Sequence, residues 1–373
     1  MKSAIEISTE FRISSDMVKV MVLKTVFVTG ATGLLGNNLV RELVSDGVRV
    51  KAAVRDRHKA ETQFEGLDGV EIVLGDMSNV PAFAVHLAAC DAVMHTAAYF
   101  RDSYKGGSHW EELKRINVDG AAALAEAAYK AGVRRFVHVS SIAVLIGQRG
   151  RPITEADDRP EKDADDYYRS KILSERAVRQ VAVAHPDMHV TYVLPGWMWG
   201  PGDAGPTSSG QTLLDIVRGK LPGIPPGSFS IVDARDVARA VILACERGRA
   251  GERYLAAGRH MTMADLVPLI GREAEVRVPK TRLPFAILYT LAVVQEAYAR
   301  VTGKPVLLSL ATVKLLAKED GRSHYDHAKS QRELGLQFRP VQDTIRDTLH
   351  WYRNIGQQHA IPVAVSSKVG ATR

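Results

Sequence analysis

A tyrosine and a lysine stand one helical turn apart in the segment DYYRSK, residues 166–171. Side chains four positions apart share a helix face, so Tyr167 pairs with Lys171, whereas Tyr168 points about 100° away and is expected to pack or to line a pocket. A phenol with a pKa near ~10 is a poor acid–base catalyst at neutral pH, but a nearby ammonium lowers that value. The spacing therefore indicates a proton-transfer pair, Tyr167 and Lys171.

Three glycines, Gly30, Gly33 and Gly36, lie in VFVTGATGLLGNNLV, residues 26–40, where a strand pattern gives way to a helical one. A dinucleotide pyrophosphate needs a tight turn, a backbone that can approach it closely and free N–H groups at a helix start. The spacing G-x-x-G-x-x-G departs from the G-x-G-x-x-G form. The flanking strand and helix nevertheless favour dinucleotide binding over a plain strand–helix turn.

The end of the next strand bears on the choice of cofactor. Arg55 follows that strand in AAVRDRHK, residues 52–59, with Arg57 and Lys59 close behind. Arginine at this place accommodates the 2′-phosphate of NADP, whereas an acidic residue binds the ribose 2′-hydroxyl of NAD. We expect NADP(H), and Asp56 leaves NAD(H) as the alternative.

Short apolar runs alternate with helical patterns through most of the chain. Such alternation predicts an α/β fold, a doubly wound parallel sheet of the Rossmann type. Its strands should be almost continuously apolar, because both faces of the sheet are covered. The expected strands are 25–30, 48–54, 70–75, 91–98, 134–141, 189–196 and 251–258, and the expected helices include 34–47, 118–132 and 232–248.

The regular alternation breaks after Pro195, where a long Gly/Pro loop, 196–210, follows. From about residue 262 to 356 the pattern is mostly helical, which predicts a smaller substrate lobe. The expected parts are a flexible extension 1–20, a dinucleotide-binding domain 21–195 with 230–258 returning to it, a lobe formed by 196–229 and 259–356, and a tail 357–373.

Further motifs accompany the glycine loop and the Tyr–Lys pair: GDMSN, HTAA, NVDGA, VHVSSIAV, LPGWMWGPGD and VDARDVARA. Together with TGATGLLG and YYRSK, they make the chain resemble the extended short-chain dehydrogenase/reductase superfamily. Within it, the chain is similar to dihydroflavonol-4-reductase-like members and to the NAD-dependent epimerase/dehydratase family. The resemblance covers residues 22–260 well and the C-terminal lobe only loosely.

The resemblance implies a role for each matching residue. Ser141, with Ser140 as the runner-up, would hydrogen-bond the substrate oxygen, and Tyr167 would pass a proton to or from it. Lys171 would hold the nicotinamide ribose and lower the tyrosine pKa, and Asn117 would support the geometry of the site. The residues implied at the cofactor are Gly30, Thr32, Gly33, Leu34, Leu35, Gly36, Arg55, Asp76, Met77, Thr96, Ala97, Ala98, Tyr167, Lys171, Pro195 and Gly196.

These residues favour an oxidoreductase that transfers a hydride between NADP(H) and a ketone, aldehyde or secondary alcohol, with Tyr167 as acid/base. Two other enzyme interpretations stay open: a nucleotide-sugar epimerase or dehydratase that retains NAD, and a 3β-hydroxysteroid-type dehydrogenase. A dinucleotide-sensing regulator on the same fold is the non-enzyme alternative, although such proteins typically lack the Tyr–Lys pair. Four aromatic residues follow expected strands and would line an apolar substrate pocket or pack the lobe: Tyr99, Phe100, Trp197 and Trp199.

The composition bears on partners and location. The net charge is +7, but no run of five basic residues occurs, so we expect a small-molecule substrate and no nucleic acid. The two cysteines, Cys90 and Cys245, sit among apolar residues. They indicate buried thiols in a reducing compartment, and the first twenty residues lack a secretory pattern, so we expect a cytoplasmic protein. The sequence does not indicate the oligomeric state, although homodimers are common among symmetric assemblies.

Two segments invite other interpretations. His324, Asp326 and His327 fall in SHYDH, residues 323–327, without a further ligand pattern, and we expect a solvated surface there rather than a metal site. The apolar stretch Phe285–Val294 is shorter than the ~20 residues that span a bilayer. We expect a buried lobe helix, with a pocket lid or a helix resting on a membrane surface as alternatives.

Overall fold

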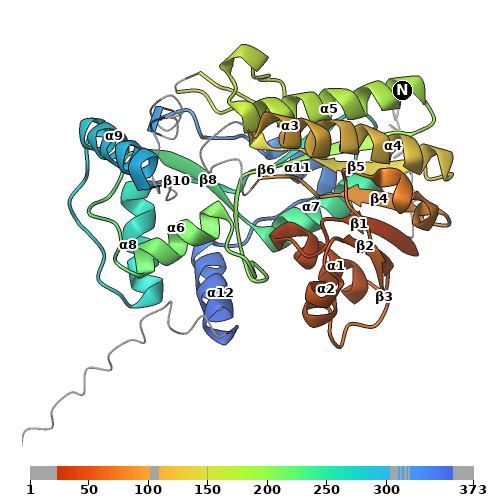
Figure 1. Ribbon diagram of the computed structural model, residues 1–373, viewed down its shortest axis with the longest axis horizontal. Helices are drawn as coiled ribbons and strands as arrows, with labels where there is room; N and C mark the ends of the chain where they lie inside the picture. The colour runs from red at the N-terminus through yellow and green to blue at the C-terminus, as the bar shows by residue number, and fades with distance from the viewer. Residues whose placement is uncertain are drawn as a thin grey trace, which may run out of the picture.

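The computed structural model describes residues 23–100, 109–148, 150–302, 310, 313, 314, 317 and 320–355. The expected extension, 1–20, and the expected tail, 357–373, lie outside these residues. Figure 1 shows a larger body around one twisted sheet and a smaller body at the opposite end of the molecule.

The larger body contains a seven-stranded, all-parallel sheet in the order β3-β2-β1-β4-β5-β6-β9. Each of the seven expected strands is present, so the predicted doubly wound fold is confirmed. The strand order reverses between β1 and β4, and ligands bind beyond the carboxyl ends of strands at such a point. The strands are β1 (Thr25–Thr29), β2 (Arg49–Val54), β3 (Val70–Leu74), β4 (Ala92–His95), β5 (Arg135–Val139), β6 (His189–Pro195) and β9 (Arg253–Ala256).

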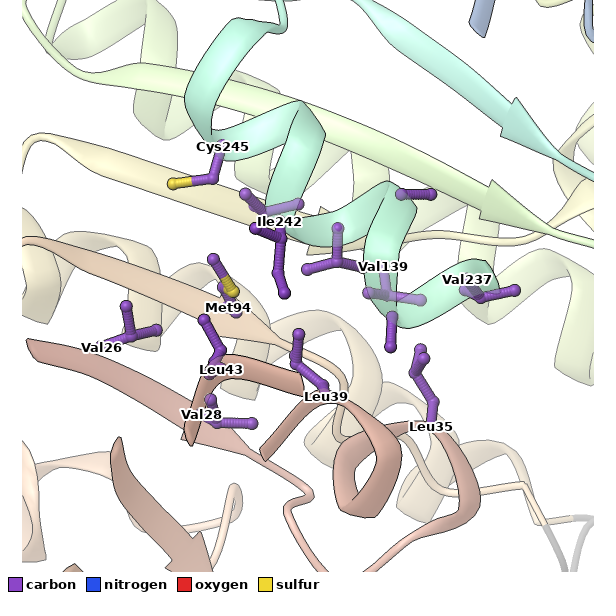
Figure 2. Packing of buried hydrophobic residues seen from close by; sticks show 14 of the residues in the cluster. Val26, Val28, Leu35, Leu39, Leu43, Met94, Val139, Val237, Ile242 and Cys245 are labelled. Carbon is purple, nitrogen blue, oxygen red and sulfur yellow. The ribbon is translucent and has the colours of Figure 1, made fainter. Parts of the chain in front are cut away.

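Alternate side chains of the strands face two helical layers. On one face, Val26 and Val28 join a cluster with residues of α1 (Leu34–Ser45) and α7 (Ala234–Arg247). Figure 2 shows this cluster, in which Leu35, Leu39 and Leu43 of α1 point toward β1 and α7. These three leucines lie at intervals of four, the spacing of one helix face.

The opposite face of the sheet packs Phe27 of β1 in a second cluster. That cluster contains Leu124 of α4 (Gly120–Lys130) and Val178 of α5 (Asp166–Ala184). The shorter elements between the strands are α2 (Arg57–Gln63), η1 (Val80–Ala82), η2 (Ala84–Leu87), α3 (Trp110–Leu113), the π-helical η4 (Lys114–Asp119), η5 (Ile142–Val144) and η6 (Glu161–Asp163).

The smaller body contains a three-stranded sheet in the order β10-β8-β7. Trp199, Leu213 and Leu266 are among the buried residues that form its core. Two elements fall inside the expected loop 196–210: β7, and the start of α6, whose N-terminus the Thr207 hydroxyl caps. The elements are β7 (Trp197–Trp199), α6 (Ser208–Val217), β8 (Ser228–Asp233), β10 (Arg259–Thr262), α8 (Met263–Ala274), α9 (Phe285–Thr302) and α12 (Val341–Asn354). The remaining helix, α11 (Ala328–Leu334), packs on the larger body.

The C-terminal segment contributes to both bodies. Leu349 and Tyr352 of α12 belong to the core of the smaller body, whereas Leu334 of α11 and Leu336 pack in the cluster beneath the seven-stranded sheet. Among the described residues, no helix has the combination of length and apolar character that crossing a membrane requires.

Candidate active site

The turn between β1 and α1 holds its glycines against neighbouring backbone. Gly30 has a φ of +67°, and a Cβ there would lie 2.8 Å from the Cα of Ala97. A Cβ on Gly36 would lie 2.2 Å from the Gly30 carbonyl oxygen, so glycine is required at both places. Gly33 stands at the N-cap of α1 without a side-chain hydrogen bond, which leaves the first N–H groups of the helix to an anion. The turn fits a pyrophosphate.

The remaining turn residues predicted at the cofactor differ in exposure. Thr32 is half-buried, whereas Leu34 and Leu35, which open α1, are almost fully buried. Their side chains therefore pack inside the protein, and only their backbone groups could contact a pyrophosphate.

At the carboxyl end of β2, Arg55 and Asp56 have different surroundings. Asp56 caps α2 by accepting a hydrogen bond from the Lys59 backbone N–H at 3.0 Å. Arg55 is exposed, and its guanidinium makes no hydrogen bond or ion pair with any described residue. The Asp56 carboxylate, which would favour NAD, thus caps a helix. The Arg55 guanidinium has no such contact among the described residues, so it could bind a 2′-phosphate.

Asp76 follows β3 at the same edge of the sheet and accepts a hydrogen bond from the Ser78 N–H at 2.8 Å. Burial alone would raise the pKa of Asp76, but the bonds from Ser78 and the charges of Arg55 and Arg115 hold that pKa below its ordinary value. Met77 beside it is buried. Asp76 is therefore an ionised acceptor close to Arg55.

Residues that follow β4 are hydrogen-bonded to Thr29, the last residue of β1. The Thr96 hydroxyl donates to the Thr29 carbonyl at 2.7 Å, and the Ala97 N–H donates to the Thr29 hydroxyl at 3.3 Å. That hydroxyl also lies 2.7 Å from Nδ1 of the buried His95. Ala98, the next residue, is exposed. These bonds place the HTAA segment beside the glycine turn, where a groove for the cofactor was predicted.

The two serines after β5 have different roles in the structure. The buried Ser140 donates its hydroxyl hydrogen bond to Glu175 at 2.8 Å. Ser141 is half-buried, and its hydroxyl oxygen accepts from the Ala143 N–H at 3.1 Å. The Ser141 hydroxyl can still donate its own proton, so Ser141 rather than Ser140 suits contact with a substrate oxygen.

Asn117 ties the end of β4 to α5. Its amide donates to the Ser170 hydroxyl at 3.0 Å and to the Tyr99 carbonyl at 3.1 Å, while its oxygen accepts from the Tyr99 N–H at 2.6 Å. The Ser170 hydroxyl in turn donates to the carbonyl of Tyr167 at 2.8 Å. Asn117 lies in the π-helical turn η4, and such turns often occur at functional sites.

Lys171 is buried, and its ammonium donates to the carbonyl of Val139, the last residue of β5, at 2.9 Å. Burial lowers the pKa of Lys171 to about 8, although the negative charge of Glu175 acts in the opposite direction. The same ammonium helps to lower the pKa of His95. The Lys171 ammonium therefore lies at the carboxyl end of β5, close enough to the end of β4 for its charge to act on His95.

Tyr167 is half-buried in the first turn of α5, which the Asp165 side chain caps by accepting from the Tyr168 N–H. The ring of Phe100 packs edge-on against the Tyr167 ring, with the two centroids 4.7 Å apart. Burial raises the pKa of the Tyr167 phenol well above its ordinary value, and the Asp165 charge adds to the rise.

The expectation that Lys171 lowers the pKa of Tyr167 is therefore wrong for this structure. Burial is the dominant cause of the shift, and the Lys171 ammonium is engaged with the Val139 carbonyl. A phenol is protonated at neutral pH even at its ordinary pKa. The raised pKa of Tyr167 strengthens that preference, which suits a proton donor better than a base.

Pro195 ends β6 on the same edge of the sheet, and Gly196 follows it. A Cβ on Gly196 would lie 2.4 Å from the Ala257 carbonyl oxygen and 2.7 Å from that of Ser230, so a side chain does not fit there. Trp197, which follows, stacks on Phe229 with centroids 4.3 Å apart. Pro195 is buried.

Of the four aromatic residues considered for a substrate pocket, Trp199 is buried in the core of the smaller body and is a packing residue. Phe100 and Trp197 remain candidates for the pocket, because both are half-buried near the candidate site. In the SHYDH segment, Asp326 accepts from the Ala328 N–H. Within the described residues, no three His, Cys, Asp or Glu side chains are grouped as a metal site requires.

Two residues that support the site were missed by the sequence analysis. Glu175 accepts from Ser140 and from Arg253, the latter at 2.5 Å, and Ser170 connects Asn117 to the backbone of Tyr167. Glu175 lies four residues after Lys171 on α5, so the helical spacing that paired Tyr167 with Lys171 could have identified it.

Comparison with known proteins gives long matches. The chain is 33% identical over 337 residues, 89% of its length, to sterol demethylase protein B of Methylococcus capsulatus, of which it covers 99%. It is 30% identical over 338 residues to a putative dihydroflavonol 4-reductase of Synechocystis, with 88% of the chain and 95% of the relative covered.

One similar solved structure is that of gox2253, with a TM-score of 0.76, 30% identity, and coverage of 90% of this chain and 99% of that one. Residues 26–257 match the model of the NAD dependent epimerase/dehydratase family. This match contains the glycine turn, both serines, the Tyr–Lys pair and β9. The chain belongs to the NAD dependent epimerase/dehydratase family, within the extended short-chain dehydrogenase/reductase superfamily, and is a nicotinamide-dependent oxidoreductase.

Proposed function

We propose that the chain is an NADP(H)-dependent reductase or dehydrogenase that acts on a ketone, aldehyde or secondary alcohol, with Tyr167 as acid/base. The observation that carries the proposal is the placement of three groups at one edge of the sheet. Ser141 is the second residue after β5, Tyr167 lies in the first turn of α5, and Lys171 reaches from the next turn to the last carbonyl of β5.

Two O–H groups at this edge suit a carbonyl oxygen. The nicotinamide, when bound, supplies or accepts the hydride at the carbon. In reduction, Ser141 donates a hydrogen bond to the oxygen and Tyr167 transfers its phenolic proton to it, which leaves a phenolate. Lys171 would hold the nicotinamide ribose, and its ammonium donates to the Val139 carbonyl at the end of β5. Oxidation of an alcohol reverses the transfer.

Replacing Tyr167 tests the acid/base role. Tyr167→Phe should lower turnover by roughly 100- to 10,000-fold, the range of general acid–base catalysis, and leave NADPH affinity nearly unchanged. Tyr168→Phe is the matched control, because its ring packs near Arg159 instead, and it should keep most of the activity. Normal turnover in Tyr167→Phe, measured by NADPH absorbance, would contradict the proposal.

Arg55 supports NADP(H) as the preferred cofactor. Because its guanidinium is exposed and unengaged while Asp56 caps α2, Arg55→Ala should weaken NADPH binding by roughly tenfold or more and hardly change NADH binding. Arg49→Ala, at the other end of β2, is the control and should change neither affinity. Calorimetric titration with both cofactors measures the difference, and an unaltered NADPH affinity in Arg55→Ala would remove the assignment.

We further propose a hydrophobic substrate. Phe100 contacts the Tyr167 ring, and Trp197 stacks on Phe229 just after Gly196. The names of two relatives, a sterol demethylase protein and a dihydroflavonol 4-reductase, also point to compounds with fused rings. A nucleotide-sugar epimerase or dehydratase that retains NAD is the rival. Mass spectrometry of the cofactor that copurifies separates the two, since retained NAD would favour the rival.

A reducing compartment, and with it a cytoplasmic location, is also part of the proposal. Cys90 and Cys245 are both free and buried, and burial raises the pKa of both thiols above the ordinary value. Such thiols behave as small apolar side chains that oxidise slowly.

A further inference from the structure

One face of α9 is apolar and exposed. Its large side chains Ile287, Val293 and Val294 are 44%, 52% and 60% exposed. Smaller exposed residues continue the same face at helical spacing, namely Ala286, Thr290 and Ala297. The opposite face is covered, because Leu288 and Ala292 are buried in a small cluster with Val313. The expected buried helix is thus buried on one side only.

The segment that leads into α9 is strongly basic. Arg272, Arg277, Lys280 and Arg282 line one groove of about 690 Å³, together with Val276, Val278 and Pro279, and no acidic side chain lines it. None of the four basic side chains makes an ion pair or hydrogen bond with a described residue. Four neighbouring cations without a partner among the described residues favour an anionic ligand or surface.

Acidic groups near these cations are few. Asp265, which lines a neighbouring pocket with Arg272, is bonded to Thr262. Between Arg272 and Ala297 the acids are Glu273, Glu275 and Glu296. Glu273 pairs with Arg346, and Glu296 accepts a hydrogen bond from the Leu310 N–H on the covered side of α9. Glu275 is exposed at the end of α8, so a net positive charge remains on this part of the surface.

The basic groove and α9 are neighbours in the chain and in the fold. Arg282 pairs by a β-bridge with Ile224, and the next residue, Leu283, packs against the covered face of α9. Figure 1 shows α8 and α9 together at the end of the molecule that lies away from β1, β2 and β3. An apolar helix face beside exposed lysine and arginine is the pattern of a helix that lies in a membrane interface.

We propose that this surface, formed by the exposed face of α9 and the four basic residues of the groove, docks on an anionic lipid bilayer. The helix lies parallel to the bilayer, with Ile287, Val293 and Val294 among the lipid headgroups and acyl chains. The cations contact lipid phosphates and carboxylates. The association does not depend on the reaction proposed above, so the two can fail separately.

Cosedimentation of the full chain with vesicles tests the proposal. The probes are vesicles of phosphatidylcholine alone and vesicles that contain in addition about 30 mol% phosphatidylserine. We expect binding to the anionic vesicles, much weaker binding to the neutral ones, and loss of binding as salt rises toward about 0.5 M. Equal binding to both kinds of vesicle, or to neither, would overturn the proposal.

Two double variants, each with a control, measure separately how much the basic residues and the apolar face contribute to vesicle binding. Lys280→Gln with Arg282→Gln should weaken anionic-vesicle binding by roughly 30-fold, at about a fivefold loss for each basic residue. The control, Lys24→Gln with Arg49→Gln, removes two exposed charges from the larger body and should leave binding unchanged. If the control variant lost as much vesicle binding as the Lys280/Arg282 variant, the binding would depend on total charge and not on this basic surface.

Val293→Ser with Val294→Ser should weaken binding by roughly tenfold, whereas Val85→Ser with Val183→Ser, two valines that are each 76% exposed elsewhere, should not. Thermal unfolding and NADPH affinity check that every variant is folded.

If the α9 variant instead dissociates a dimer that does not bind vesicles, a second copy of the chain covers this face and the proposal is wrong. Complete competition by millimolar inorganic phosphate would likewise replace the bilayer by a small anion.

Discussion

Glu175 is a buried carboxylate on α5, one helical turn after Lys171. It is 2% exposed and accepts hydrogen bonds from Arg253 at 2.5 Å, Arg179 at 3.2 Å and Ser140 at 2.8 Å. Its charge also acts on Lys171, where it opposes the fall in pKa that burial causes. A buried carboxylate in this position therefore influences both the fold and the proton-transfer pair.

Glu175→Gln removes that charge and keeps the size of the side chain. The pKa of Lys171, about 8 in the structure, should fall, because the group that opposed the effect of burial is gone. The ammonium is lost as pH rises through this pKa, so NADPH affinity should begin to decline at a lower pH than in the parent. Leaving Arg253 without its buried partner should also cost about 3 kcal/mol of stability.

The measurement is NADPH affinity between pH 6 and about 9, with urea unfolding at neutral pH. Glu126→Gln is the control, because Glu126 lies on α4 beside Lys130 and His185, away from Lys171. A variant that is destabilised but keeps the parent pH profile would show that Glu175 has a structural role only.

At the residue scale, the spacing of residues in the sequence predicted contacts within one helix but not contacts between a helix and the sheet. The interval of four paired Tyr167 with Lys171, and both now lie on α5. The Val139 carbonyl that binds the Lys171 ammonium belongs to β5, and its distance from α5 depends on how helix and sheet pack. The same packing buries Tyr167, so the direction of its pKa shift could not be read from the spacing.

At the scale of elements, the junction of β1 and α1 leaves no room for a side chain. A Cβ on Gly36 would meet the Gly30 carbonyl oxygen at 2.2 Å, whereas one on Gly33 would lie 3.2 Å from the same atom. Alanine normally stabilises a helix interior by about 1 kcal/mol relative to glycine. Here the clash with backbone outweighs that gain.

Gly36→Ala should therefore destabilise the protein by roughly 1–3 kcal/mol, the range for overpacking, and weaken NADPH binding, because the turn must open. Gly33→Ala is the graded comparison and should cost less stability, since its contact is a few tenths of an ångström from normal. Urea unfolding and NADPH titration measure both effects. An alanine at position 36 that leaves stability unchanged would mean that α1 can move away from the turn without cost.

The elements of the larger sheet were predictable because its central strands carry apolar runs between two helical layers, as β1 does with five buried residues. The edge strand β3, VEIVL, departs from that pattern, since only Val73 of it is buried. The three-stranded sheet was not predictable, and its strand β7 shows why. It has only three residues, Trp197–Trp199, which is too short for a period of two to be visible among the glycines and prolines around it. Its pairing with β8 is set by contact between distant segments.

At the scale of the whole molecule, two buried histidines of the larger sheet should make the free energy of unfolding depend on pH in the acid range. His95 and His138 are partners in the register of β4 and β5, and their rings lie 5.4 Å apart. Burial, with the Lys171 charge, lowers the pKa of His95 to about 3. Burial, with the charges of His95 and Lys171, also lowers the pKa of His138. The His95 ring is therefore neutral in the folded protein at pH 5, and the lowered pKa of His138 opposes its protonation in the same way.

The unfolded chain binds protons to these histidines below a pH of about 6.5, whereas the folded chain does not. The free energy of unfolding should therefore be independent of them above that pH and fall as pH decreases from about 6.5 to 5, by up to about 1.4 kcal/mol per pH unit for each histidine. Carboxyl groups with a raised pKa, such as Glu155 and Asp236, act in the opposite direction at lower pH, so the measurement should stop near pH 5.

His138→Phe removes one of the two groups and keeps a ring in the buried space beside Tyr192. Urea unfolding at several pH values should then show about half of the parent's loss of stability between pH 6.5 and about 5. His350→Gln, an exposed position on α12, is the control and should keep the parent's slope. A slope unchanged by His138→Phe would mean that His138 takes up a proton in the folded protein, and that the centre of the sheet admits a charge that its burial should exclude.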